Sequence, residues 1–322
     1  MQSKSGNNNS NRIYLIDNTK VILIILVVFA HFLEAINSFS SDISILYRAI
    51  YIFHMPALIF LAGFNTKSQF SKQRVIGLLF LYIIFQTLYS LLINKYSILT
   101  PHWIMWFIPS LIFWRLSIHL FKKTRYPFTI AIILAIISGY FPIIGYPLSL
   151  SRTFVFLPFF ILGHFHGERI LLLCRKYNKA LILPVGIAAI SVSSYFIIDV
   201  RWLYSSFSYQ SLGAEGINSI IMRTICLVSS TIGIITLLTF IPDKKFTWSS
   251  IGTKILPIYL LHGFFVISLK NVVIVLASYN IAAAVALAAV STYILVKLLS
   301  SEKISKIIYA IYNYSSSKKS VI

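Results

Sequence analysis

The chain has 322 residues, of which 58% are hydrophobic and 11% are charged. Apolar segments of about 20 residues, the length that an α-helix needs to cross hydrocarbon, recur along it. The formal net charge is +20, but the cations are distributed among short loops, where they orient helices and meet anionic lipid. This composition predicts an all-α integral membrane protein and argues against a nucleic-acid-binding protein. Its two cysteines, Cys174 and Cys226, give no disulfide framework and no metal site.

The apolar segments predict ten transmembrane helices. They cover residues 13–36, 46–66, 75–94, 102–121, 127–145, 152–168, 180–199, 217–240, 252–272 and 278–299. The first segment follows a polar, Asn-rich stretch and has no small-residue cleavage site, so we expect it to remain as a span. One transmembrane domain, residues 13–300, is therefore expected between a tail of residues 1–12 and a basic tail of residues 301–322.

The loops between these spans alternate in charge. Lysines and arginines gather near residues 67–74, 122–125, 169–179 and 244–245, whereas the intervening loops carry scattered cations. Because basic loops face the cytoplasm, both termini and both tails are predicted to be cytoplasmic.

Two histidines stand inside neighbouring apolar segments, His31 in 21 VILIILVVFAHF 32 and His54 in 50 IYIFHMPALIFLAGF 64. An ionisable residue inside a membrane span is expensive and usually functional. His31 lies about 27 Å along an outward-running helix, and His54 lies near the outer start of the returning helix. The two imidazoles are therefore predicted to meet near the outer leaflet, although a membrane histidine that only hydrogen-bonds a neighbouring helix is the alternative.

Other polar and aromatic residues fall at related depths. Trp103, Trp106, Arg152 and Arg223 belong to the outer halves of their spans, and His262 lies nearer the middle. Together they would line a cavity that opens outward, although tryptophans also form ordinary interfacial belts. Three aromatic residues of the outer loops are expected to set specificity: Tyr146, Trp202 and Tyr204.

Such a cavity suits acyl transfer to an alcohol. A neutral imidazole accepts the alcohol's proton, and a fixed cation stabilises charge that develops on the carbonyl oxygen. His31 is the candidate base. Arg152 or Arg223 would stabilise the oxyanion or hold an anionic substrate.

Asp17 and Lys20 lie three residues apart near the cytoplasmic end of the first span, on one helical face. One interpretation is a surface ion pair with a snorkelling lysine. In the other interpretation, Lys20 faces the cytoplasmic route of an anionic acyl donor.

Several segments resemble the membrane-bound acyltransferase 3 family, in particular its fucose 4-O-acetylase-like and capsule or O-antigen O-acetyltransferase branch. The opening 12 RIYLIDNTKVILIILVVFAH 31 is similar to the family's Arg, Asp, basic residue and His. Further similar segments follow in family order over almost the whole chain: 53 FHMPALIFLAGF 64, 106 WFIPSLIFWRL 116, 157 LPFFILG 163 and 253 TKILPIYLLH 262.

This resemblance implies a ten-helix fold in the bacterial plasma membrane that transfers an acetyl group from cytoplasmic acetyl-CoA to a sugar hydroxyl of a polysaccharide or lipid-linked glycan, without a metal. It implies that His31 is the catalytic histidine, with Lys20 as its basic partner and Asp17 in the same motif. Lys20 stands where many members have arginine, which grips a carbonyl or phosphate with two donors. The donor's nucleotide is expected to be held by four cations: Arg12, Lys72, Arg74 and Lys122.

Two other classes of protein are alternatives to an acyltransferase. A glycan transporter or flippase employs intramembrane cations and histidines without making bonds. A catalytically silent scaffold for a glycan synthase would tolerate the loss of His31.

Overall fold

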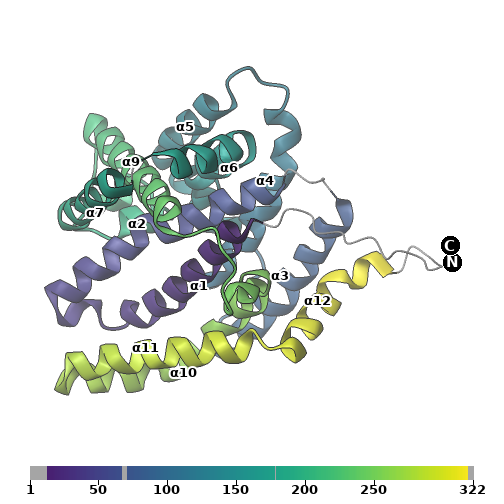
Figure 1. Cartoon of the computed structure of the whole chain (residues 1–322), viewed down its shortest axis with the longest axis vertical. Helices are drawn as coiled ribbons and strands as arrows, with labels where there is room; N and C mark the ends of the chain where they lie inside the picture. Colours follow the sequence, from purple (N-terminus) through teal and green to yellow (C-terminus); the bar gives the residue numbers. More distant parts are fainter. Residues whose placement is uncertain (1–12, 67–70, 178, 318–322) are drawn as a thin grey trace.

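The computed structural model describes residues 13–66, 71–177 and 179–317, and every regular element in these ranges is a helix (Figure 1). Nine of its helices are long and apolar enough to cross a membrane. The prediction of an all-α, multi-pass membrane protein is confirmed at this level. Residues 1–12, with the predicted donor-binding Arg12, lie outside the described ranges.

Twelve α-helices follow one another in the described residues. They are α1 (Tyr14–Glu34), α2 (Ser41–Asn65), α3 (Lys72–Ile93), α4 (Phe107–Phe121), α5 (Pro127–Ile137), α6 (Leu150–Lys176), α7 (Lys179–Phe196), α8 (Arg201–Tyr204), α9 (Gly216–Phe240), α10 (Ile255–Tyr279), α11 (Ile281–Leu299) and α12 (Glu302–Ser317). Short 3-10 turns precede or follow several of them, among them η3 (Trp103–Trp106) and η8 (Ser249–Thr253).

The fifth predicted span differs most from the structure. Instead of one helix over residues 127–145, α5 and the turn Ser138–Tyr140 form a shorter apolar helix of residues Pro127–Tyr140. Its 14 residues rise about 21 Å, less than the roughly 30 Å of a hydrocarbon core. The sequence 141 FPIIGYP 147 follows the end of the helix, and its two prolines begin successive short turns, Pro142–Ile144 and Pro147–Ser149.

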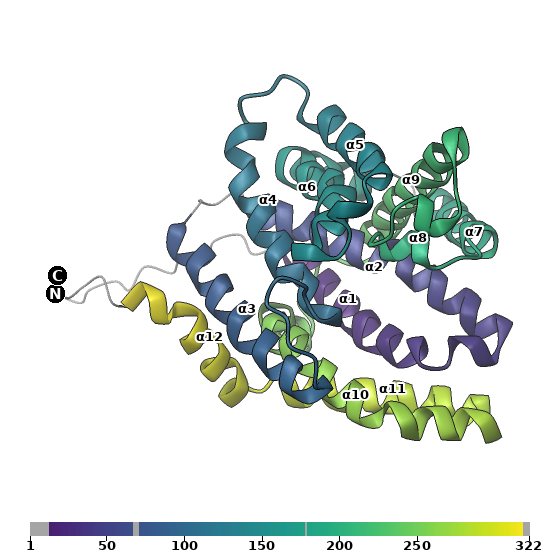
Figure 2. The same ribbon diagram turned by 180° about the vertical axis from the view of Figure 1, so that it is seen from behind.

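Residues predicted to form a basic tail instead form α12, which lies along α3 (Figures 1 and 2). A Cβ atom added to Gly77 of α3 would come within 2.3 Å of the carbonyl oxygen of Tyr312, so the two helices are in close contact. Lys254 pairs with Glu302 at the start of α12, and the Tyr309 hydroxyl donates to the Thr253 carbonyl at 2.8 Å. The end of the chain is thus part of the bundle.

The crossing of α2 and α6 depends on two glycines. A Cβ atom at Gly63 would lie 2.1 Å from the carbonyl oxygen of Phe160, and one at Gly163 would lie 2.0 Å from that of Phe60. Small residues of this kind let membrane helices approach backbone to backbone. The crossing fixes α2 against α6, the two helices that carry His54 and Arg152.

Pro56 interrupts the hydrogen-bond ladder of α2, because proline has no N–H to offer to the carbonyl of Ile52. The hydroxyl of Ser230 on α9 donates to that carbonyl at 2.6 Å. A backbone acceptor that would be costly to leave free in lipid is therefore satisfied by a neighbouring helix.

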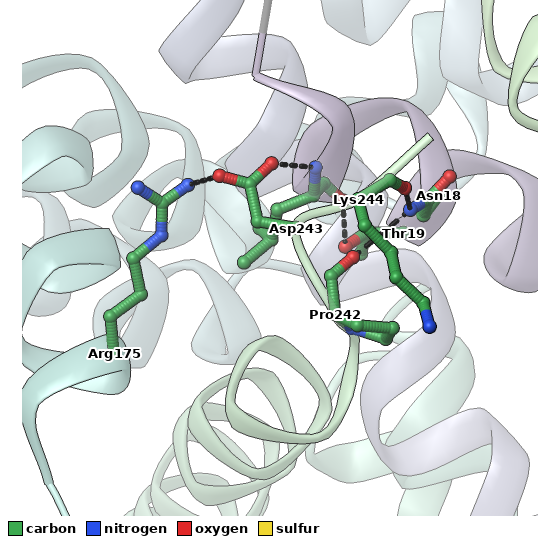
Figure 3. A network of polar contacts seen from close by, with 7 residues as sticks. Asn18, Thr19, Arg175, Pro242, Asp243 and Lys244 are labelled. Atoms are coloured by element: carbon green, nitrogen blue, oxygen red, sulfur yellow. Dashed lines mark hydrogen bonds and ion pairs between the residues drawn. The ribbon is translucent and has the colours of Figure 1, made fainter. Parts of the chain in front are cut away.

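The beginning of α1 is held by the loop after α9 (Figure 3). The buried Asn18 amide donates to the carbonyls of Pro242 and Lys244 at 3.0 and 2.9 Å, and the Leu15 N–H donates to Asp243 at 2.8 Å. Asp243 also pairs with Arg175 of α6. These contacts fix the rotation of α1 about its own axis.

We expect Gly163→Ala to lower the stability of the fold, because the new methyl group would meet backbone atoms that cannot move aside. Overpacking of this kind costs about 1–3 kcal/mol. Thermal unfolding in detergent, followed by circular dichroism, should show a lower Tm for this variant.

Gly167→Ala, one turn further along α6, is the matched control. There the added methyl would meet the side chain of Phe64 rather than backbone, so a smaller loss is expected. Equal Tm values for Gly163→Ala and the wild type would contradict this account of the crossing.

Candidate functional site

A cavity of about 180 Å³ lies where the last turn of α1 and the middle of α2 meet η3, α6 and α8. It contains one acidic and one basic side chain, two histidines and several aromatic rings. We call it the His31 cavity; it is lined by His31, Glu34, Tyr51, His54, Met55, Trp103, Ile104, Trp106, Tyr146, Arg152, Phe156, Leu203 and Tyr204.

His31 and Glu34 form a pair on the last turn of α1. The Nδ1 atom of His31 lies 3.1 Å from Oε2 of Glu34. An ionised carboxylate accepts hydrogen bonds only, so Nδ1 donates its hydrogen and the lone pair of a neutral imidazole is left on Nε2. Trp103 also donates from Nε1 to the same carboxylate oxygen, at 3.2 Å. This arrangement fixes the tautomer of a neutral His31, with its Nε2 lone pair free of the Glu34 contact.

Two further histidines surround the pair. The ring of His262 stacks on that of His31 with centroids 5.4 Å apart. His262 donates from Nδ1 to the Ile258 carbonyl, and His54 donates in the same way to the carbonyl of Ile50, both at 2.9 Å. The Nε2 atom of His262 is buried and has no hydrogen-bond partner among the described residues. A cluster of three imidazoles with defined tautomers therefore lies at this end of α1.

The loop that carries Trp103 is fixed by α3. The Gln86 side chain accepts from the His102 N–H at 3.0 Å and donates to the carbonyls of Ser97 and Thr100. Trp103 itself has a φ of 36°, in the left-handed region that tryptophan rarely adopts. Strain of this kind persists only where the surroundings impose it. Here the imposed conformation directs the indole against His31, with ring centroids 4.5 Å apart.

Arg152 forms the cationic side of the cavity. Its guanidinium donates to the Tyr204 carbonyl at 3.0 Å and to the Ser206 hydroxyl at 3.3 Å. It also lies over the rings of Trp106 and Tyr146, at 5.1 and 5.6 Å. The guanidinium therefore holds α8 in place and presents a positive charge to the cavity that Glu34 also lines.

Tyrosines complete the polar wall. The hydroxyls of Tyr47 on α2 and Tyr204 on α8 lie 2.8 Å apart, and the ring of Tyr51 packs between Tyr204 and His54. Burial raises the pKa of the Tyr204 phenol to about 12. This hydroxyl therefore keeps its hydrogen near neutral pH and remains available as a donor.

Arg223 lies outside the His31 cavity. Its buried guanidinium donates to the Trp202 carbonyl at 3.2 Å and to the Ser205 hydroxyl at 3.3 Å, beside a small void of about 10 Å³. The void shares Tyr51, Phe156 and Leu203 with the cavity. Since Arg223 and Arg152 bind successive residues of one segment, the structure assigns Arg223 to the support of α8 and not to the cavity wall.

A second, larger cavity of about 440 Å³ adjoins the opposite half of α1, and we call it the Lys20 cavity. It is mainly apolar, with two basic side chains. Among the residues that line it are Lys20, Ile24, Val27, Met55, Leu58, Leu61, Ala62, Asn65, Arg115, Leu256, Tyr259, Tyr309 and Tyr312. Lys20 lies 3.7 Å from Asp17, and Nε of Arg115 is buried with no hydrogen-bond partner among the described residues. The two tyrosines from α12 close this cavity at one side.

One face of α1 lines both cavities. Lys20, Ile24 and Val27 belong to the Lys20 cavity, and the same spacing of three and four residues continues to His31 and Glu34 in the other. Lys20 and His31 are eleven residues apart, or about 16 Å along the helix. Lys20 and Asp17 are therefore not brought to His31, and the three do not form one catalytic cluster.

Many of the residues predicted to lie together do so, but others lie apart. The structure brings seven predicted residues to one cavity: His31, His54, Trp103, Trp106, Tyr146, Arg152 and Tyr204. The predicted His262 does not line it but stacks on His31, and Trp202 lies beside Arg223 at the small void. Predicted donor-binding cations Lys72, Arg74 and Lys122 are exposed at helix ends and line neither cavity.

Two charged residues that line these cavities were not predicted, Glu34 and Arg115. Glu34 carried a signal, since a carboxylate three residues after a histidine shares its helical face. Arg115 carried none, because its place in the wall of the Lys20 cavity depends on how α4 packs against α3 and α6.

Comparison with protein-family models, with curated proteins and with solved structures gives no match for this chain. The described residues form a helical protein with nine helices long and apolar enough to cross a membrane, and His31 and Glu34 line one of its cavities.

Proposed function

We propose that this chain is a membrane O-acyltransferase that moves an acetyl group from acetyl-CoA to a sugar hydroxyl of a cell-surface or lipid-linked polysaccharide. The proposal rests on one observation: a single face of α1 runs from the Lys20 cavity, which is mainly apolar with two basic side chains, to the His31–Glu34 pair. Acyl transfer between two compartments requires one site for a thioester with an anionic head and another for an alcohol beside a base. The resemblance to the acyltransferase 3 family points to the same activity.

The charge of the loops supports the orientation. Under the positive-inside rule, the Lys20 cavity faces the cytoplasm of a bacterium and the His31 cavity faces outward across the plasma membrane. The apolar Lys20 cavity then accepts the pantetheine arm of acetyl-CoA, with Lys20 and Arg115 as cations for the phosphates. The length of α1 between Lys20 and His31 is comparable to that of an extended pantetheine arm.

The chemistry follows from the pair on α1. Nε2 of His31 takes the proton of the acceptor hydroxyl while the hydroxyl oxygen attacks the carbonyl carbon of the thioester. Negative charge on the carbonyl oxygen is stabilised by the guanidinium of Arg152 or by a hydroxyl such as that of Tyr204. The C–S bond then breaks, the thiolate of CoA takes the proton from the imidazolium, and the ester is complete.

The aromatic lining supports a sugar as the acceptor. Trp103, Trp106 and Tyr146 present ring faces or edges to the cavity, and Arg152 and Tyr204 supply donors for hydroxyl groups. Such a combination of flat apolar surface and fixed donors suits a pyranose ring, which has an apolar face and an equatorial rim of hydroxyls.

The proposal predicts that His31→Ala abolishes transfer of labelled acetyl from acetyl-CoA to glycan in membranes that contain the chain and an acceptor. Mild alkali should release the label from the wild-type product, as expected for an O-ester. His166→Ala, an exposed histidine of α6, is the control and should retain activity. Equal label with His31→Ala would remove His31 from the mechanism. The absence of alkali-labile label from the wild type, with acceptor present, would favour a transporter or scaffold.

Glu34→Gln should lower kcat by about 10² to 10⁴ with little change in KM for acetyl-CoA, because the amide does not enforce the productive tautomer of His31. Glu34 acts through His31 and is a positioning residue. Steady-state kinetics with Glu215→Gln, an exposed site before α9, provide the control. A rise in KM at constant kcat would contradict this role and indicate a contact with the donor.

A further inference from the structure

We propose that Met55 is the movable partition between the Lys20 cavity and the His31 cavity, and that its side chain limits the acyl group to a short one. This inference rests on the proposed function and names the class of donor that the site accepts. Among the described residues, Met55 is the one that lines both cavities.

The position of Met55 on α2 explains this double contact. Tyr51 and His54 line the His31 cavity just before it. Leu58 and Ala62, one and two turns after it, line the Lys20 cavity. Met55 therefore occupies the point on α2 where one cavity ends and the other begins, opposite the segment of α1 between Val27 and His31.

The other side of the partition is rigid. Tyr259 lines the Lys20 cavity and Ile104 lines the His31 cavity. The Tyr259 hydroxyl donates to the Ile104 carbonyl, which ties α10 to η3 across the boundary. Methionine, in contrast, has three rotatable bonds and adapts to irregular spaces. The movable component of the partition is thus Met55.

The sizes of the two cavities limit the length of the acyl group that can extend past Met55. A pantetheine arm would lie in the space of about 440 Å³, but the acyl group extends beyond the sulfur, past Met55, into a cavity of about 180 Å³. That smaller cavity must also receive the acceptor hydroxyl. An acetyl group adds one methyl beyond the carbonyl, whereas butyryl and hexanoyl chains would have to displace the methionine side chain.

The same side chain separates the thioester from water on the acceptor side. Without it, water in the His31 cavity would reach the carbonyl carbon of a bound thioester, with His31 as base. The C–S bond would break to give the free acid and CoA thiol, with no acceptor consumed.

The test compares Met55→Ala with Met55→Phe and with Leu58→Ala, which widens the Lys20 cavity alone. Purified protein in nanodiscs receives acetyl-, butyryl- or hexanoyl-CoA with or without acceptor glycan, and thiol release and ester formation are measured. Met55→Ala should raise the ratio of butyryl to acetyl transfer about tenfold, since one or two methylenes in an apolar space are worth that much. It should also release thiol without acceptor.

Met55→Phe should lower acetyl transfer while CoA binding is retained, and Leu58→Ala should keep the wild-type chain-length ratio. An unchanged ratio in Met55→Ala, in protein with a wild-type unfolding profile, would overturn the partition. If Met55→Ala unfolds, an unchanged acetyl rate in folded Met55→Phe would overturn it instead. Failure of the wild type to transfer any acyl group would overturn the proposed function and this inference with it.

Discussion

The helical period of α1 is the constraint on which the site depends. Eleven residues make three turns with an excess of only about 20°, so Lys20 and His31 share one face of one straight element. That face is the common wall of two cavities. It retains this position because both ends of α1 are held: Asn18 is bound by the loop after α9, and Glu34 receives the indole N–H of Trp103. Rotation of α1 by a quarter turn would move Lys20 out of one cavity and His31 and Glu34 out of the other.

The remaining helices bring partners to the two ends of this face. Gly63 and Gly163 allow α2 and α6 to cross in close contact, which places His54 and Arg152 at the His31 end. α12 and α4 contribute Tyr309, Tyr312 and Arg115 at the other. In the proposed reaction this division holds the donor and the acceptor apart except at Met55, so specificity for each substrate is set by separate residues. Such a division would allow residues of the His31 cavity to differ between acceptors while residues of the Lys20 cavity stay the same.

The sequence was most informative where one helix carries the signal by itself. The lengths of the apolar segments predicted most of the helices. His31 and His54 drew attention because they are ionisable residues inside such segments. The pairing of His31 with Glu34 was equally accessible, because it depends only on helical spacing. The interactions that the sequence did not disclose all join distant elements: Arg115 to the Lys20 cavity, Arg223 to the α8 segment, and α12 to α3. Residues such as Ile308 and Tyr312 give α12 an apolar side. The helix that covers this side is α3, because Gly77 allows close approach and the packing of the bundle brings the two helices together.

In the proposed reaction, donor and acceptor meet from opposite sides of the membrane along α1. Sealed vesicles of known orientation test this arrangement, with labelled acetyl-CoA on one side and acceptor glycan on one side or the other. We expect transfer when acetyl-CoA is on the side of the Lys20 cavity and the glycan is on the side of the His31 cavity, and little transfer in the other arrangements. Efficient transfer with both substrates confined to the same side would contradict it.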